Sequence, residues 1–422
     1  MKVRRSGLTR DARLLVAGQG LRAAGYGFTA VVLGALLADR GFNTLQTGAV
    51  LTALIAGTAL ASLAVGRFAD LIGRRRSYAL FFGGIALAGV VVAAGGPWWI
   101  LLLVGLTGTL STDVVDNGPA TTLEQTMLAA EDAGTAAVYG RYNAVGSAAG
   151  ALGSLAVTLP GLGSHDVPGW LFLCLVPVGI GGALLAWGLS AAVEPPAAPA
   201  SEPTARARSQ LGPSRTLVRR LAGLFAVDAA GGGLVTTGFL SYYFTERYHV
   251  PVVDLGWLFF GVAVVQAVSV ALAPRLARRF GLIATMVGTH LPSNVLLAAI
   301  AFAPGFAAAA GLLLARTTLS QMDVPTRQAL VMTVVTPGER TVAAAVTNAS
   351  RYSIRPVGPL IAGLLQQLAL GAPLVVAGAI KAGYDLTLWN WTSRLGLADR
   401  QHAQRPDTAD SAASTASPGE SS

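Results

Sequence analysis

The sequence predicts an all-helical integral membrane protein with twelve transmembrane helices in two pseudo-symmetric six-helix bundles. Of its 422 residues, 53% are hydrophobic and 12% are charged, and the mean hydropathy is +0.58. Soluble domains carry about 25% charged residues, so this composition excludes an ordinary soluble enzyme and a disordered protein. Twelve apolar stretches follow one another along the chain, and the two halves carry similar residues at similar positions.

Each apolar stretch is long enough, or nearly so, to cross a bilayer, which takes about 20 helical residues. The backbone must satisfy its own hydrogen bonds inside lipid, so we predict helices for all of them. The first stretch is too long for a signal peptide and lacks a following cleavage site, so it counts as a retained span. The predicted spans are 14–38, 45–66, 78–95, 98–118, 134–159, 169–193, 217–244, 255–274, 282–303, 306–334, 341–368 and 372–391.

Basic residues gather in alternate loops, and this sets the predicted topology. If the N-terminus is cytoplasmic, the loops on the opposite side hold only Arg40 and Arg247. The cytoplasmic segments hold the other loop cations, grouped at 2–13, 67–76, 206–220, 275–279, 340 and 394–405. The positive-inside rule therefore places both termini in the cytoplasm. We expect the chain to lie in the cell (inner or plasma) membrane. It also explains the net charge of +9 without nucleic acid as a partner.

Polar segments divide the chain into four parts. Residues 194–216 are rich in Pro, Ala, Ser and charge, which predicts a cytoplasmic linker. Residues 394–422 have the composition of a disordered cytoplasmic tail. These segments leave an N-terminal six-helix bundle at 1–193 and a C-terminal one at 217–393.

The two bundles are predicted to be repeats. Paired residues recur about 210 positions apart, as in transporter folds built from parallel repeats. The pairs are Asp39-Arg40 with Glu246-Arg247, Gly73 with Gly281, Asp113-Val114 with Asp323-Val324, and Arg141-Tyr142 with Arg351-Tyr352.

Several kinds of site are excluded. Cys174 is the single cysteine, so no internal disulfide or Cys-rich metal site is expected. The chain has no Gly-x-x-x-x-Gly-Lys-Ser/Thr run, which argues against ATP as its energy source. We expect neither a metal nor a cofactor.

The loop after the second predicted span reads Gly66-Arg67-Phe68-Ala69-Asp70-Leu71-Ile72-Gly73-Arg74-Arg75-Arg76. It resembles the signature loop of the major facilitator superfamily, Gly-x-x-x-Asp-Arg-x-Gly-Arg-Arg/Lys, with Leu71 in place of the usual Arg. A degenerate copy, Pro274 to Gly281, follows the eighth span, with Arg278 at the acidic position. The resemblance implies the fold of this superfamily, in a form similar to bacterial drug or metabolite efflux proteins. It also implies a cytoplasmic gate that uses Gly66, Asp70, Gly73, Arg74 and Arg75.

A glycine run in the fifth span, Gly146 to Gly153, resembles the antiporter motif of the superfamily but lacks the proline after Gly150. It favours export, although close helix packing explains small residues equally well. The Arg that the superfamily usually carries in the fourth span is absent, and Asp113 and Asp116 stand there instead.

Charges inside the predicted spans are the candidate functional residues, because a buried charge costs at least about 2.5 kcal/mol at mid-bilayer. The candidates for proton coupling and the substrate cavity are Arg22, Asp113, Asp116, Asp228, Asp323, Arg327, Arg351 and Arg355. The depth of Asp228 in the seventh span and of Arg22 in the first predicts that these two pair.

For several of these and other charges a purely structural role, or simple exposure to water, is an alternative explanation. The repeat predicts structural pairs of Asp113 with Arg141 and of Asp323 with Arg351. Lys381 and Asp385 are four residues apart in a peripheral helix and are also expected to form a structural pair. Asp116 and Glu124 are expected to face cytoplasmic water, and His290 is expected to be peripheral.

These observations favour a secondary active transporter that works by alternating access, and not an enzyme. Our first interpretation is proton-coupled export of a small organic molecule, a drug or metabolite, by a monomer in the lipid bilayer. The alternatives are proton-coupled uptake of an organic anion and a non-transporting receptor on the same fold.

Overall fold

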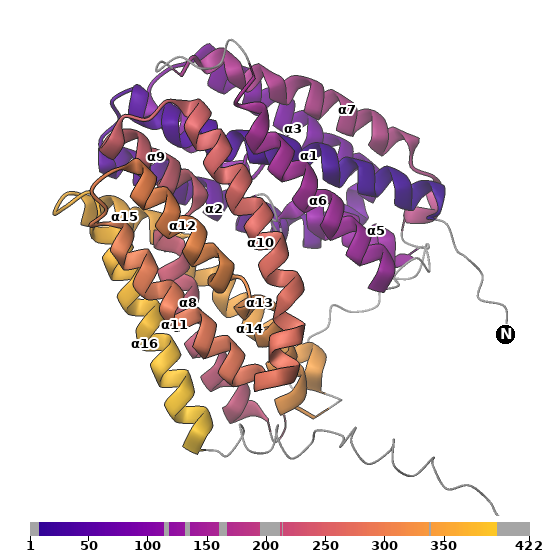
Figure 1. Ribbon diagram of the computed structural model, residues 1–422. Helices are drawn as coiled ribbons and strands as arrows, with labels where there is room; N and C mark the ends of the chain where they lie inside the picture. The colour runs from indigo at the N-terminus through magenta and orange to yellow at the C-terminus, as the bar shows by residue number, and fades with distance from the viewer. Residues whose placement is uncertain are drawn as a thin grey trace, which may run out of the picture.

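The predicted all-helical architecture is confirmed in a computed structural model that describes residues 8–113, 118–130, 136–159, 167–194, 212, 214–336 and 339–394 (Figure 1). Within these residues, seven helical segments are each long and apolar enough to cross a membrane. The other predicted spans are interrupted, shorter or more polar. Together the segments make the twelve crossings of two six-helix bundles.

The first bundle contains the first six crossings. Its elements are α1 (Arg10–Asp39), α2 (Thr44–Ile72), α3 (Arg74–Ala94), α4 (Trp98–Leu106), α5 (Pro119–Ala130), α6 (Ala136–Ala156), the 3₁₀ helix η1 (Gly169–Cys174), α7 (Leu175–Gly188) and the 3₁₀ turn η2 (Ala191–Val193).

The second bundle contains the other six crossings. Its elements are α8 (Arg215–Leu234), α9 (Thr237–Tyr248), α10 (Val252–Phe280), α11 (Leu282–Ile300), α12 (Phe306–Ser320), α13 (Asp323–Val334), α14 (Arg340–Ile354), α15 (Val357–Gln366) and α16 (Ala372–Arg394).

Local sequence explains how equivalent helices end in the two bundles. Gly73 separates α2 from α3 with a φ of +100°, and Gly281 separates α10 from α11 with a φ of +89°. Residues with a Cβ rarely adopt such angles, so glycine allows a tight turn at both places. At the start of α2, Asn43 and Gln46 form a reciprocal capping box.

The fourth crossing extends further than the sequence predicted. The expected span 98–118 is interrupted after Leu106, and α5 continues the crossing to Ala130. Pro119 begins this second segment, at the helix position where a missing N–H costs nothing. Both α4 and α5 pack against α2 and α3, so they belong to one path through the bundle. As a result Glu124 is fully buried, and the expectation that it faces water is wrong.

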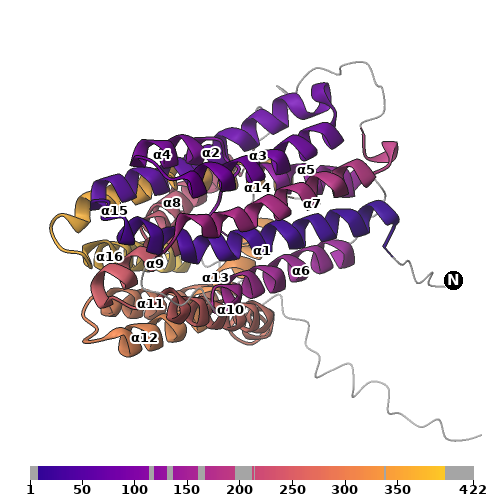
Figure 2. The same ribbon diagram turned by 90° about the horizontal axis from the view of Figure 1, so that it is seen from above.

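The two bundles join at one end and diverge at the other (Figure 1). The joined end is built by α1 against α9, α2 against α15, and α6 against α10, and α6 and α10 run side by side in the view from above (Figure 2). Small residues bring the backbones close together there. A Cβ on Gly48 would lie 2.6 Å from the carbonyl oxygen of Pro359, and one on Gly256 would lie 3.1 Å from that of Ser154.

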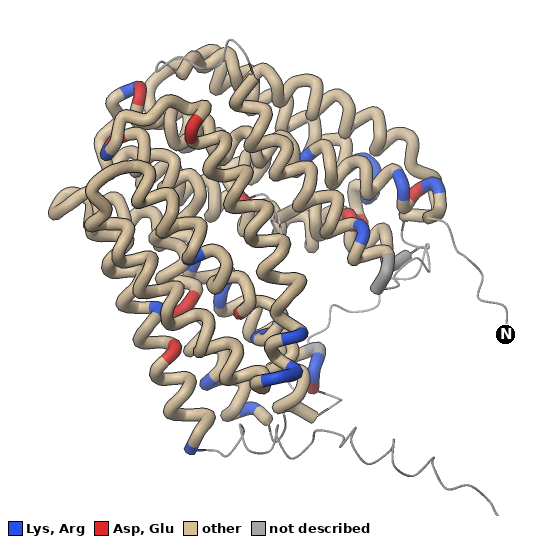
Figure 3. Tube along the Cα trace, viewed as in Figure 1, with Lys and Arg blue, Asp and Glu red and all other residues tan. Residues whose placement is uncertain are grey.

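A buried hydrogen bond also crosses the joined end. The Ser241 hydroxyl on α9 donates to the carbonyl oxygen of Val31 on α1 at 2.5 Å. The diverging ends instead carry most of the basic residues, which appear as blue segments near the helix termini in Figure 3. Close apolar packing therefore closes one end of the molecule, and the charged ends stand apart.

Candidate functional site

Two groups of buried charged residues occupy the interior of the protein, one in each bundle. We call them the Arg22 cluster and the Asp228 cluster. The Arg22 cluster comprises Gln19, Arg22, Tyr78, Thr121, Glu124 and Tyr142. The Asp228 cluster comprises Asp228, His290, Asn294, Asp323, Arg327, Arg351, Lys381 and Asp385.

The Arg22 cluster is a closed ion pair with hydroxyl partners. An Nη of Arg22 on α1 lies 3.0 Å from a carboxylate oxygen of Glu124 on α5, and their side chains are 1% and 0% exposed. The Tyr78 and Tyr142 hydroxyls each donate to the same carboxylate at 2.5 Å. Four helices, α1, α3, α5 and α6, are thereby tied to one carboxylate. A buried charge needs such a paired and hydrogen-bonded partner.

The predicted pairing of Arg22 with Asp228 is therefore wrong in this conformation. Each residue has its partners within its own bundle, because Glu124 on α5 lies beside Arg22 and Lys381 on α16 lies beside Asp228. A buried Glu in the stretch 119–130, which is otherwise free of charge, is the sequence signal that would have found this pair.

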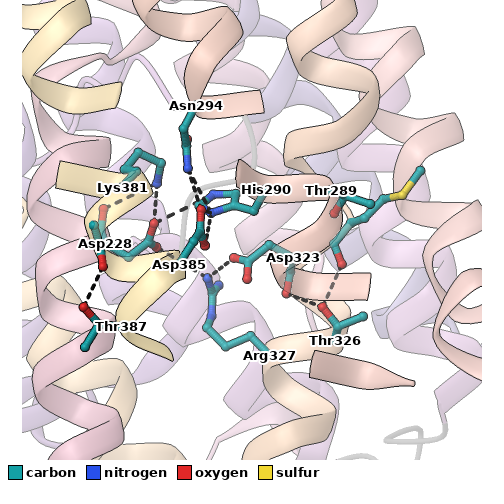
Figure 4. Close-up of polar contacts among 12 residues, drawn as sticks. Asp228, Thr289, His290, Asn294, Asp323, Thr326, Arg327, Lys381, Asp385 and Thr387 are labelled. Atoms are coloured by element: carbon teal, nitrogen blue, oxygen red, sulfur yellow. Dashed lines mark hydrogen bonds and ion pairs between the residues drawn. The ribbon is translucent and has the colours of Figure 1, made fainter. Parts of the chain in front are cut away.

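The Asp228 carboxylate on α8 is the centre of the second cluster, and its residue is only 3% exposed (Figure 4). Lys381 on α16 forms an ion pair with it. Its oxygens also lie 3.7 Å from Arg327 on α13 and 3.9 Å from Arg351 on α14. The Nε2 atom of His290 on α11 is 3.9 Å away. Four helices besides α8 thus direct a basic group at one carboxylate.

A second layer of contacts surrounds this centre. The Nδ1 atom of His290 lies 2.9 Å from a carboxylate oxygen of Asp385, and the amide of Asn294 donates to the same carboxylate at 2.8 Å. Arg327 also pairs with Asp323 one helical turn before it. The His290 ring therefore bridges Asp385 and Asp228 (Figure 4).

Three expectations about these residues need correction. Lys381 pairs with Asp228 instead of Asp385, and His290 is 3% exposed and lies within the cluster instead of at the periphery. Both differences arise because α16 packs against α8 and α11, an arrangement that helical spacing alone does not specify. Asp323 pairs with Arg327, so the predicted pair with Arg351 does not form.

Asp113 and Arg355 connect the two bundles. An oxygen of Asp113 lies 2.5 Å from an Nη of Arg355, with side chains 27% and 32% exposed. The predicted partner Arg141 is exposed on α6. The repeat-based pairing of Asp113 with Arg141 is therefore wrong, because Asp113 follows the break in the fourth crossing and lies against the other bundle. Asp116 lies outside the described residues.

The signature loop lies at the diverging end. The Nε atom of Arg74 is 2.7 Å from an oxygen of Asp70, whose side chain is 62% exposed. The Glu194 carboxylate accepts hydrogen bonds from the backbone N–H groups of Arg74 at 2.7 Å and Arg75 at 3.1 Å. Glu194 therefore caps the positive N-terminus of α3. The sequence assigned this residue to the linker and missed the contact.

The other two gate candidates, Gly66 and Gly73, differ in whether the structure requires a glycine at their position. Gly66 is exposed on α2, and a Cβ there would meet no atom within 4 Å. Gly73 is required by its backbone angle.

A recess opens beside the Asp228 cluster between α8, α13 and α14. Its volume is about 40 Å³, room for one or two water molecules or a small charged group. Its walls combine two guanidinium groups, amide and hydroxyl groups and apolar side chains, from Phe225, Arg327, Gln328, Val331, Met332, Ala344, Thr347, Asn348 and Arg351.

Comparisons with known proteins agree with this architecture. A sequence profile of the Major Facilitator Superfamily matches residues 15–359. An uncharacterized membrane protein of Saccharomyces cerevisiae, YJR124C, is 25% identical over 418 residues, which cover 90% of this chain and 93% of the yeast protein.

Solved structures share the fold at low sequence identity. The nucleoside transporter NupG superposes with a TM-score of 0.70 at 14% identity and covers 91% of this chain and 99% of its own. A bacterial homologue of the iron transporter ferroportin, in an inward-facing state, gives 0.65 at 20% identity, with coverage of 92% and 100%. At these identities the likeness establishes the fold alone.

Proposed function

Because the chain belongs to the Major Facilitator Superfamily, whose members are membrane transporters and not enzymes, we propose that it is a proton-coupled secondary transporter. In this proposal it moves a small organic molecule by alternating access. The single observation that carries the proposal is the Asp228 carboxylate, buried inside a membrane bundle and shared by basic groups from four other helices.

The arrangement of the bundles supports alternating access. If both termini are cytoplasmic, as the loop charges predict, the diverging ends face the cytoplasm and this conformation is inward-facing. In this proposal the linker 194–216 between the bundles 1–193 and 217–393 is cytoplasmic, and so is the tail 394–422; both segments lie largely outside the described residues. In this proposal Asp70 is a gate residue whose exposed carboxylate gains partners when the cytoplasmic ends close. The protein acts as a monomer in the cell membrane.

Proton coupling follows from the cost of charge in the membrane. Adding a proton to the Asp228 cluster changes its net charge by one, and buried charge is expensive enough to shift a conformational equilibrium. The carboxylates Asp228, Asp323 and Asp385 and the His290 ring are the groups of the cluster that can take up this proton. Lys381, Arg327 and Arg351 face Asp228. Their positive charges determine how strongly the bound proton shifts the equilibrium between the inward-facing and outward-facing conformations.

We propose export as the direction of transport. The glycine run on α6 supports it by its resemblance to the antiporter motif. Export by antiport predicts that cargo accumulates inside proteoliposomes when their lumen is the acidic side. Accumulation when the outside is the acidic side would favour the runner-up, uptake. A receptor on the same fold would bind its ligand and give no flux in either direction.

The test is transport in proteoliposomes with and without an imposed proton gradient. Asp228→Asn should abolish gradient-driven flux while cargo exchange without a gradient persists. Asp254→Asn is the matched control, because Asp254 is an exposed carboxylate at the start of α10 in the same bundle. Full gradient-driven flux in the Asp228 variant would overturn the assignment. A folded Asp228 variant that loses exchange as well would place Asp228 in cargo binding instead of coupling.

A further inference from the structure

The interior of the second bundle carries more positive charge than its carboxylates balance. Three buried carboxylates, Asp228, Asp323 and Asp385, share it with four permanent cations, of which Lys381 and Arg327 are buried and Arg316 and Arg351 are half-buried. This leaves one excess positive charge even with His290 neutral. Such an imbalance in a membrane interior is costly, so it indicates a counter-charge from outside the chain.

Two of the cations are incompletely paired. Arg316 on α12 forms no ion pair among the described residues, and its buried Nε atom has no hydrogen-bond partner there. The Nε atom of Arg351 is likewise without a partner in the described part of the chain, and its nearest carboxylate oxygen is 3.9 Å away on Asp228. Arg327 repels Arg351 electrostatically. Arg351 therefore keeps hydrogen-bonding capacity that the protein does not use.

The recess lies where this capacity is concentrated. Arg327 and Arg351 line it together with the amide side chains of Gln328 and Asn348. Guanidinium groups bind carboxylates and phosphates through paired N–H donors, and amides add further donors. The Arg351 side chain is 25% exposed, so the recess reaches the surface of the bundle.

We propose that this recess binds the anionic head group of a small organic anion, and that such an anion is the cargo. The inference rests on the proposed transport function and adds the chemical class of the substrate. Arg351 makes the first contact, and Arg327 and Asn348 complete the binding of a carboxylate or a phosphate group. The recess holds about 40 Å³, so only the head group enters it.

The rest of the ligand is expected to be apolar near the head group. Phe225, Val331 and Met332 form the other wall of the recess. Arg327 already lies over the Phe225 ring, 5.7 Å from its centroid, so one guanidinium joins the polar and apolar walls. A neutral drug-like molecule would leave the excess charge uncompensated.

The first test measures ligand-induced thermal stabilisation of the purified full-length chain. The anionic probes are benzoate, succinate and phenyl phosphate, and the neutral probes are benzamide and succinamide. At least one anion should raise the melting temperature, and the amides should not. In Arg351→Gln the apparent affinity for that anion should fall at least tenfold, and Arg351→Lys should recover part of it, because the charge returns without the paired donors.

The matched control is Arg141→Gln, which removes an exposed arginine from the first bundle and should leave anion binding unchanged. Equal stabilisation by amides and anions, unchanged affinity in the Arg351 variant, or no stabilisation by any probe would each overturn the proposal. Preference between benzoate and phenyl phosphate distinguishes a carboxylate cargo from a phosphate cargo.

A second readout separates binding from structural roles. Because an excess charge destabilises the empty protein, Arg316→Gln should raise the melting temperature of the ligand-free chain by about 2 °C. A purely structural role predicts a decrease, which would contradict the charge imbalance. Anion binding without proton-driven flux would refute the proposed function and leave this site standing. Proton-driven flux of a neutral cargo, independent of Arg351, would refute the anion site and leave the proposed transport function standing.

Discussion

Glu124→Gln provides the sharpest test of how the first bundle is held together. Glu124 is the only carboxylate in contact with Arg22 among the described residues, and both side chains are almost completely buried. The substitution keeps the shape of the side chain but removes its charge, so Arg22 becomes an uncompensated cation inside the membrane segment. The new amide also offers a donor where Tyr78 and Tyr142 already donate.

The expected cost follows from these contacts. Removing one member of a buried ion pair destabilises a protein by about 3–5 kcal/mol. Folded proteins are stable by only about 5–15 kcal/mol, so the loss should be a third of the total or more. The double variant Arg22→Gln/Glu124→Gln removes both charges and should recover at least about 2 kcal/mol of the loss.

The assay is unfolding of the purified protein in detergent, followed by tryptophan fluorescence as a double-mutant cycle. Arg141→Gln is the control within the same bundle and should change the free energy of unfolding by less than about 0.5 kcal/mol. The reasoning fails if Glu124→Gln matches the parent protein, or if the double variant loses the sum of both single losses.

Three further predictions concern the loops and the junction between the bundles. Glu194→Gln should weaken the cap of α3 and lower the free energy of unfolding by about 0.5–2 kcal/mol in the same unfolding assay. An unchanged free energy of unfolding would show that the cap does not stabilise the protein. Gly34→Val should force α1 away from α9, because its side chain would overlap the facing backbone, so spin-label distances at the joined end should lengthen; unchanged distances would contradict this. Asp113→Asn removes the ion pair with Arg355 that links the bundles, so a cysteine introduced at the diverging end should become more reactive to thiol reagents. The charge-swapped pair should restore the parent reactivity, and identical reactivity in all three proteins would show that the ion pair does not influence the conformation.

Local signals in the sequence were sufficient for the fold. The apolar stretches predict spans because each must satisfy its backbone in lipid, and Gly73 and Gly281 were recognised as repeat-related positions. The structure shows that both form equivalent turns with positive φ angles. The loop from Gly66 to Arg76 was sufficient to identify the superfamily. These signals depend on neighbouring residues in the chain, so they can be read without knowing how the helices pack.

The partners of the buried charges depended on the tertiary structure. Periodicity places Asp228 and Lys381 inside the membrane, but only the packing of α8 against α16 brings them together across 153 residues of sequence. Repeat symmetry suggested partners for Asp113 and Asp323 within each half, yet one contacts the opposite bundle and the other its own helix. Hydrophobicity thus determined which segments enter the bilayer, because burial is a property of each segment. The partners in the charge network were decided by which helices pack together, because an ion pair forms only between groups a few ångströms apart in space. Separation along the sequence does not reveal which groups are that close.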